Sequence, residues 1–216
     1  MKTKILFISM YGIENNAPRL LSAILKKNNY DVSSIFFKNW KNNNIKEPTS
    51  IEFNLLFKEI SKFNPDIIGI TFGSPYFNIV KKISSEIKRK FKNIYLIFGG
   101  IHATTVPEEC INYCDAVCIG EGDKIFLELV NKFETKINFT DTPNFWFKLN
   151  NQIIKNKLTS LVEDLDVLPF KDLSNENKYY IDYNKLYYGD PILKIKEFRI
   201  SASRGCLYRC SYCYNS

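Results

Sequence analysis

The chain has a single histidine among its 216 residues and lacks any long apolar run. A transmembrane helix needs roughly 18–20 consecutive apolar residues, and no segment reaches that length. The N-terminal segment has too short an apolar core for a secretory signal peptide. These absences argue against a membrane partner, and they predict a cytoplasmic protein.

Two further classes of protein are disfavoured by what is missing. No export signal accompanies the six cysteines, so a disulfide framework is not expected, and thiols in a reducing compartment more often bind metals. The net charge of +7 comes from scattered Lys and Arg, without a basic stripe interleaved with aromatic side chains. Nucleic-acid binding is therefore not expected. With 45% hydrophobic and 25% charged residues, the composition is typical of a globular chain of one or two domains.

Short apolar runs alternate with amphipathic segments along the first two thirds of the chain. Strand-like runs cover residues 4–9, 32–37, 67–72, 94–98 and 116–119. Helical spacing of apolar residues covers residues 20–25, 51–63, 77–91, 107–113 and 123–133. Alternation of this kind predicts a five-stranded parallel sheet with helices on both faces, a flavodoxin-like or Rossmann-like α/β fold.

Small and polar residues follow the predicted strands directly. In parallel sheets ligands bind at the carboxyl ends of the strands, where glycines let the backbone approach a bulky ligand. The candidate binding residues are Gly12, Glu14, Thr71, Ser74, Gly99, Gly100, His102, Gly120, Glu121 and Gly122. This pattern alone identifies no ligand. His102 can equally be structural, and Glu121 can equally serve to begin the helix at Asp123.

Two other features carry no predicted site. Cys110, Cys114 and Cys118 repeat at helical spacing, but the helix is expected to end at Asp115, so they are predicted to be buried as small apolar side chains. Residues 144–155 predict a hairpin within a linker, residues 139–197. The tyrosine-rich segment 179–188 has no interpretable motif, and packing against a following domain is its default interpretation.

Three thiols stand near the end of the chain at CxxxCxxC spacing. Cys206, Cys210 and Cys213 follow a predicted strand at residues 198–201. Three thiolates on one loop can each bind one iron of a 4Fe-4S cluster, which leaves the fourth iron open to a substrate or cofactor. A zinc site or free thiols remain as alternatives, although zinc usually takes four N or S ligands in paired spacings.

This loop, with Tyr212 before its third cysteine, resembles the cluster loop of radical S-adenosylmethionine enzymes. In that family the open iron binds S-adenosylmethionine, and an electron from the cluster cleaves it to a 5′-deoxyadenosyl radical. The resemblance implies a reductant such as flavodoxin or ferredoxin. A complete barrel needs on the order of 200 residues. Residues 198–216 are therefore expected to be only the start of a truncated radical domain, catalytically incomplete on its own.

The pattern Gly99-Gly100 followed by Gly120-Glu121-Gly122 resembles the cobalamin-binding domain that precedes many radical S-adenosylmethionine barrels, here residues 1–138. The resemblance implies cobalamin as cofactor and methyl transfer as the reaction. The wider family places Asp-x-His-x-x-Gly after the first strand, and its histidine binds cobalt. Here Gly12-Ile13-Glu14 stands in that loop, which implies cobalamin without a histidine ligand from it.

Two alternatives stay open on the sequence. The chain can be a free-standing corrinoid-binding module whose cysteines have little function. It can also belong to a radical S-adenosylmethionine protein whose α/β domain docks a substrate or partner instead of cobalamin.

Overall fold

The computed structural model describes residues 2–40, 45–195, 203–208, 210–211 and 213. The predicted strand at residues 198–201 lies outside these described residues. Among them, no helix is long and apolar enough to cross a membrane.

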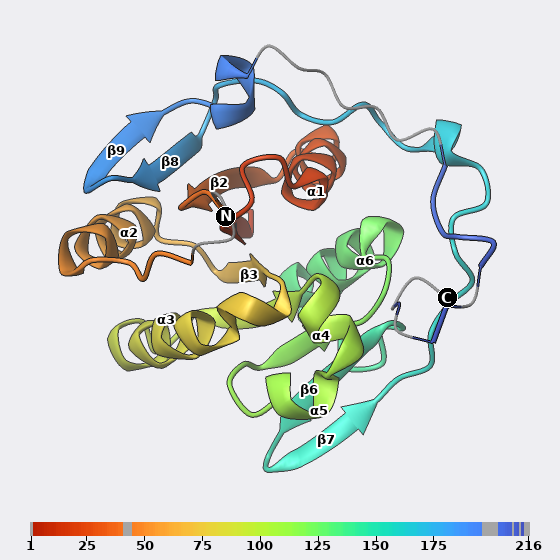
Figure 1. Cartoon of the computed structure of the whole chain (residues 1–216). Coiled ribbons are helices and arrows are strands. Elements are labelled where there is room, and N and C mark those ends of the chain that lie inside the picture. The colour runs from red at the N-terminus through yellow and green to blue at the C-terminus, as the bar shows by residue number, and fades with distance from the viewer. Residues whose placement is uncertain (1, 41–44, 196–202, 209, 212, 214–216) are drawn as a thin grey trace.

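The five predicted strands are present and parallel. They are β1 (Lys4–Met10), β2 (Asp31–Phe37), β3 (Ile67–Thr71), β4 (Tyr95–Gly99) and β5 (Ala116–Cys118). Their order in the sheet is β5-β4-β3-β1-β2, the order of flavodoxin-like folds (Figure 1). The predicted fold class is therefore confirmed.

The predicted total of five strands is wrong, because the described part of the chain forms one nine-stranded sheet. Antiparallel β6 (Phe145–Leu149) and β7 (Gln152–Lys155) extend it beyond β5. At the opposite edge β8 (Lys178–Asp182) pairs in parallel with β2, and β9 (Lys185–Tyr188) pairs with β8. An edge strand leaves N–H and C=O groups unpaired, and both hairpins satisfy them. Four strands thus come from the predicted linker, and two of them lie in the tyrosine-rich segment.

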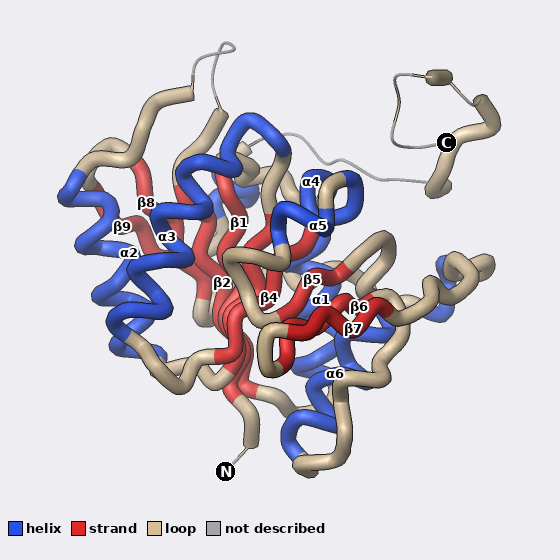
Figure 2. The backbone as a smooth tube through the Cα atoms, turned by 90° about the horizontal axis from the view of Figure 1, so that it is seen from below, coloured by secondary structure: helices blue, strands red, loops and turns tan. Residues whose placement is uncertain are grey.

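Helices cover both faces of the sheet (Figures 1 and 2). On one face, α1 (Asn16–Lys27) and α6 (Asp123–Glu134) bury an apolar core that includes Phe7 and Leu129. On the other face, α2 (Ser50–Phe63) and α3 (Phe77–Lys90) bury a second core that includes Ile8 and Ile83. The strands between the two cores are apolar on both sides, as expected of a buried parallel sheet.

The helix predicted at residues 107–113 is present but shorter, as α5 (Pro107–Cys110). A short helix that was not predicted, α4 (Ile101–Thr105), precedes it and is separated from it by Val106. Proline has no N–H to continue a helix and disfavours helical backbone at the preceding residue, so the break falls at Val106. Single 3-10 turns complete the described secondary structure: η1 (Ser74–Tyr76), η2 (Leu165–Val167) and η3 (Pro191–Lys194). As predicted, Cys110, Cys114 and Cys118 are buried free thiols.

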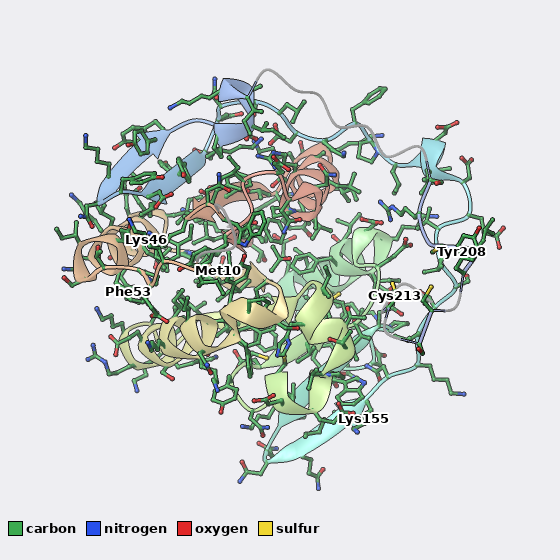
Figure 3. The ribbon with its side chains drawn as sticks, viewed as in Figure 1. Met10, Lys46, Phe53, Lys155, Tyr208 and Cys213 are labelled. Carbon is green, nitrogen blue, oxygen red and sulfur yellow. The ribbon has the colours of Figure 1, made fainter. Side chains whose placement is uncertain are left out.

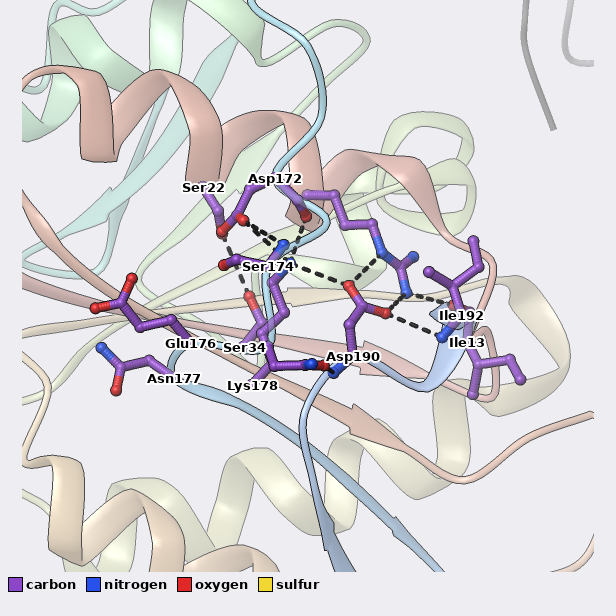
Figure 4. Close-up of polar contacts among 12 residues, drawn as sticks. Ile13, Ser22, Ser34, Asp172, Ser174, Glu176, Asn177, Lys178, Asp190 and Ile192 are labelled. Atoms are coloured by element: carbon purple, nitrogen blue, oxygen red, sulfur yellow. Dashed lines mark hydrogen bonds and ion pairs between the residues drawn. The ribbon is translucent and has the colours of Figure 1, made fainter. Parts of the chain in front are cut away.

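Two buried ion clusters hold the β8–β9 hairpin. Lys38 Nζ lies 2.8 Å from each carboxylate oxygen of Glu52 and 2.9 Å from Asp182 Oδ1. On the other side Arg19 Nε donates to Asp190 Oδ2 at 2.8 Å, and Lys178 Nζ lies 3.0 Å from the same oxygen (Figure 4). These charges are almost completely buried, and they join the hairpin to α1, to α2 and to the residue that follows β2.

Candidate functional site at the carboxyl edge of the sheet

The ends of three neighbouring strands lie side by side at one edge of the sheet. Ser9 at the end of β1 is paired in register with Thr71 at the end of β3, and Thr71 with Gly99 at the end of β4. The segment Gly120-Glu121-Gly122 follows β5, which pairs with β4. The structure therefore brings the sequence-predicted segments after β1, β3, β4 and β5 to a common edge.

The loop after β1 is shaped by a residue that the sequence analysis did not select. Arg19 Nη2 donates to the Ile13 carbonyl and Nη1 to the Asn15 carbonyl, each at 2.7 Å. Ser9 Oγ donates to the Gly12 carbonyl at 3.0 Å, and Asn15 Nδ2 donates to Thr71 Oγ1 at 3.3 Å. The conformation of the Gly12–Glu14 segment thus depends on the buried Arg19, whose carboxylate partner is Asp190.

Three glycines at this edge differ in the space that a side chain would find, namely Gly99, Gly100 and Gly120. Gly100 has φ +89°, and a Cβ there would lie 2.7 Å from Thr71 Oγ1, so the chain itself excludes a side chain. A Cβ at Gly99 would meet only Cys118 Cβ, at 3.9 Å. At Gly120, with φ +72°, a Cβ would meet nothing within 4 Å. The backbone at Gly99 and Gly120 is therefore uncovered, which fits the close approach of a large ligand.

His102 lies on α4 with 6% of its surface exposed. Its Nδ1 is 3.0 Å from Ser74 Oγ, and its ring centroid is 4.4 Å from that of Phe77. Its Nε2 is buried and has no hydrogen-bond partner among the described residues. Burial lowers the pKa of His102 despite the opposing charge of Glu109, so the imidazole is neutral near pH 7. The structure pairs two predicted site residues, His102 and Ser74, with each other, and a ligand contact for either stays a prediction.

Glu121 lies at the centre of a polar cluster. Its Oε2 accepts the Val162 N–H at 3.0 Å, and its Oε1 accepts from Arg204 Nη1 at 3.0 Å. Arg204 also pairs with Asp123, the first residue of α6. A cleft of about 380 Å³ lies here, lined by Glu121, residues 161–166, Ser203 and Arg204. Both carboxylate oxygens of Glu121 are thus occupied by the protein itself.

The three predicted metal-binding cysteines are accessible but not gathered. Cys206 and Cys213 are exposed, Cys210 is half-buried, and none of the three forms a disulfide within the described residues. The Cys213 N–H donates to the Cys210 carbonyl at 3.0 Å, which closes a tight turn between these two thiols. In the described part of the chain, no three His, Cys, Asp or Glu side chains come close enough to hold a metal ion. In Figure 2 the tan parts of the segment that carries these cysteines lie to one side of the sheet, and Figure 3 labels Cys213.

The thiols nevertheless have the composition of a cluster site with one open iron. Three accessible thiols within eight residues match the donor set of three cluster irons, and the loop offers no fourth cysteine. Metal binding is coupled to folding, so the thiols of this loop can be drawn together when a metal binds.

Fold and site together define a flavodoxin-like α/β domain with an uncovered ligand edge and a neighbouring cysteine loop. Residues 11–130, more than half of the chain, match the B12 binding domain family. The chain belongs to this family, which confirms the resemblance that its glycine pattern suggested.

Its relatives include larger enzymes. The chain is 29% identical over 171 residues to an uncharacterized methyltransferase of Pyrococcus horikoshii, covering 77% of this chain and 35% of that protein. It is 24% identical over 165 residues to the anaerobic magnesium-protoporphyrin IX monomethyl ester cyclase of Cereibacter sphaeroides, covering 73% of this chain and 26% of the cyclase. The chain thus spans about a third or less of the length of these curated relatives.

Solved structures share the fold. The apo form of OxsB, a cobalamin-dependent S-adenosylmethionine radical enzyme, superimposes with a TM-score of 0.70 at 18% identity, over 98% of this chain and 28% of OxsB. The radical S-adenosylmethionine methyltransferase TsrM of Kitasatospora setae, with cobalamin and a [4Fe-4S] cluster bound, gives 0.57 at 16% identity, over 73% of this chain and 31% of TsrM. The described fold is therefore shared with a part of each of these two enzymes.

Proposed function

We propose that this chain is the cobalamin-binding part, together with the cluster loop, of a cobalamin-dependent radical S-adenosylmethionine enzyme of the methyltransferase type. The observation that carries the proposal is that a B12-binding domain and a three-cysteine loop lie next to each other. A B12-binding domain with uncovered glycine backbone at Gly99 and Gly120 contacts, through Arg204, the start of a loop with three cysteine thiols. Nothing in the described residues identifies the substrate.

Cobalamin fits the carboxyl edge of the sheet. The backbone at Gly99 and Gly120 would lie against it, with Thr71 and Gly12 at the neighbouring strand ends. When bound, cobalamin supplies a cobalt that accepts and donates a methyl group. The shape of this site depends on the chain's own hydrogen bonds, because Arg19 and Asn15 fix the loop after β1.

A 4Fe-4S cluster fits the cysteine loop by donor type and number. Cys206, Cys210 and Cys213 would bind three irons, and the fourth would be open to S-adenosylmethionine. A reductant such as flavodoxin or ferredoxin would supply the electron. The exposure of two of the three thiols keeps the loop accessible to iron, sulfide and such a partner.

Substitution of Gly99 tests the cobalamin site. A Cβ at Gly99 has ordinary clearance from the protein, at 3.9 Å from Cys118 Cβ. Gly99→Val should therefore leave the melting temperature nearly unchanged. It should weaken cobalamin binding about tenfold or more, because added side-chain volume must displace the ligand. Titration calorimetry with hydroxocobalamin measures the affinity, and circular dichroism checks the fold.

The two alternatives correspond to distinct outcomes of that titration and of an iron analysis of the same chain. If the wild-type chain binds no corrinoid, the α/β domain docks a substrate or partner, and the cobalamin half of the proposal is overturned. If corrinoid binds normally and the cysteine loop takes up no iron, the chain is a corrinoid-binding module.

The cobalt is expected to have no imidazole ligand from this chain. Gly12-Ile13-Glu14 offers none, and His102 is buried with Nδ1 beside Ser74. Electron paramagnetic resonance of the Co(II) form should show no nitrogen superhyperfine splitting. Splitting that persists in His102→Ala would indicate the cofactor's own base, and splitting that disappears in this variant would identify His102 as the ligand.

A further inference from the structure

We propose that Arg204 is a positioning residue that holds the start of the cysteine loop against the carboxyl edge of the sheet. Binding of a 4Fe-4S cluster by this loop rests on the proposed function, but the position of the loop is a property of this chain. Arg204 stands two residues before Cys206, and its partners Glu121 and Asp123 stand directly after β5. The three side chains are called the Arg204 cluster below.

The contacts of the Arg204 cluster span more than eighty residues of sequence. Arg204 Nη1 donates to Glu121 Oε1 at 3.0 Å and also contacts Asp123 Oδ2. Side-chain exposure is 33% for Arg204, 20% for Glu121 and 10% for Asp123. An ion pair in open solvent contributes little, but pairs that are partly buried and share one cation are screened much less by salt.

Glu121 is a rigid anchor because the protein holds it at both ends. Its second carboxylate oxygen accepts the Val162 N–H, and its backbone carbonyl accepts from Asn144 Nδ2 at 3.0 Å. Asn144 Oδ1 in turn accepts the Thr159 N–H at 2.6 Å. The carboxylate that Arg204 contacts is therefore already fixed to the segment after β7. Little conformational entropy of the Glu121 side chain is then lost when Arg204 binds it.

The anchor also lies next to the uncovered part of the ligand edge. Gly120, which immediately precedes Glu121, donates its N–H to Thr104 Oγ1 at 3.0 Å and has open space at its Cβ position. A loop fixed at Glu121 thus begins beside the place where the backbone admits a ligand. In an enzyme with both cofactors bound, this would set the distance between a 4Fe-4S cluster at the thiols and cobalamin at the strand ends.

A distance measurement without any cofactor tests the positioning. Nitroxide labels are attached to Cys206 and to Thr135→Cys at the exposed end of α6, with Cys210→Ser and Cys213→Ser, because the remaining three thiols are buried. Double electron–electron resonance should give a single narrow distance distribution. Arg204→Gln should lose that narrow peak, and Arg204→Lys should keep part of it. Arg89→Gln is the matched control, because within the described residues Arg89 pairs only with Glu86, on the exposed face of α3.

The proposal is overturned if Arg204→Gln and Asp123→Asn keep the wild-type distribution at an unchanged melting temperature. In the loaded chain, the magnetic interaction between the reduced cluster and Co(II) should be lost or scattered in Arg204→Gln, with iron and cobalt contents unchanged. If the wild-type chain binds neither cofactor, the proposed function fails, while the nitroxide measurement still decides the role of Arg204.

Discussion

Replacing Asp190 by Asn should lower the free energy of unfolding by about 3–5 kcal/mol, the typical cost of leaving a buried charge without its partner. The side chains of Arg19 and Asp190 are both 0% exposed, and that of Lys178 is 1% exposed. Asn keeps the shape and can still accept the Ile192 N–H, so the variant removes mainly the charge. Urea unfolding followed by circular dichroism measures the loss.

Asp141→Asn is the matched control, because Asp141 pairs with Lys132 on the surface with 60% of its side chain exposed. This variant should leave the unfolding midpoint unchanged. An equal loss in both variants would contradict a special role for the buried pair. Because Arg19 also bonds to the Ile13 and Asn15 carbonyls, Asp190→Asn should in addition reduce hydrogen-exchange protection in the loop after β1.

The same cluster makes the fold sensitive to acid. Burial alone would raise the pKa of Asp190, but the hydrogen bond and charge of Arg19 hold it below its usual value. For Asp172, hydrogen bonds from Ser174 and Lys26 overcome burial and lower the pKa to about 2. A carboxylate with a depressed folded-state pKa stabilises the fold above its unfolded value, near 3.9, and that stability is lost as the pH falls further. Asp190→Asn should therefore lose less stability between about pH 4 and 2 than the wild type does.

The central fold could be predicted because local pattern and topology agree. Continuous apolar runs such as residues 67–72 match buried parallel strands, and each is followed by a helix with one apolar face. The edges could not be predicted in the same way. The pairing of β8 with β2 joins Ser34 to Lys178, and it depends on ion clusters whose members are more than a hundred residues apart. Tyrosine favours strands, so the composition of residues 179–188 is compatible with β8 and β9, but it does not indicate which strand they pair with.

The candidate site was predictable in position but not in its side-chain partners. In a parallel sheet the carboxyl ends of the strands lie at one edge, which predicts that Thr71 and Gly99 are close together. The structure pairs them in register. The sheet topology did not indicate that Glu121 is occupied by Val162 and Arg204, because those partners come from segments without regular spacing. The one available signal for Arg19 was a basic residue among apolar positions of α1, and for Arg204 its place beside the Gly-Cys of the thiol loop.

Loss of any one of the three C-terminal thiols should abolish stable 4Fe-4S uptake. The anaerobically reconstituted wild-type chain is expected to bind about four irons, as one cluster requires. Cys206→Ala, Cys210→Ala or Cys213→Ala leaves two thiols on the loop, and a cluster held by two protein ligands is exposed to loss of iron. Iron and sulfide analysis, together with the visible absorbance of the cluster, measures the uptake.

Cys110→Ala provides the matched control for those variants. Cys110 is a buried thiol, and burial raises its pKa to about 12, so it is not ionised and does not compete for iron. This variant should keep the full iron and sulfide content and differ from the wild type only by a small loss of stability. Equal iron content in all four variants would place the cluster elsewhere. A stoichiometric zinc content that depends on the same three thiols would instead identify a structural metal site, and would remove the radical chemistry from the proposed function.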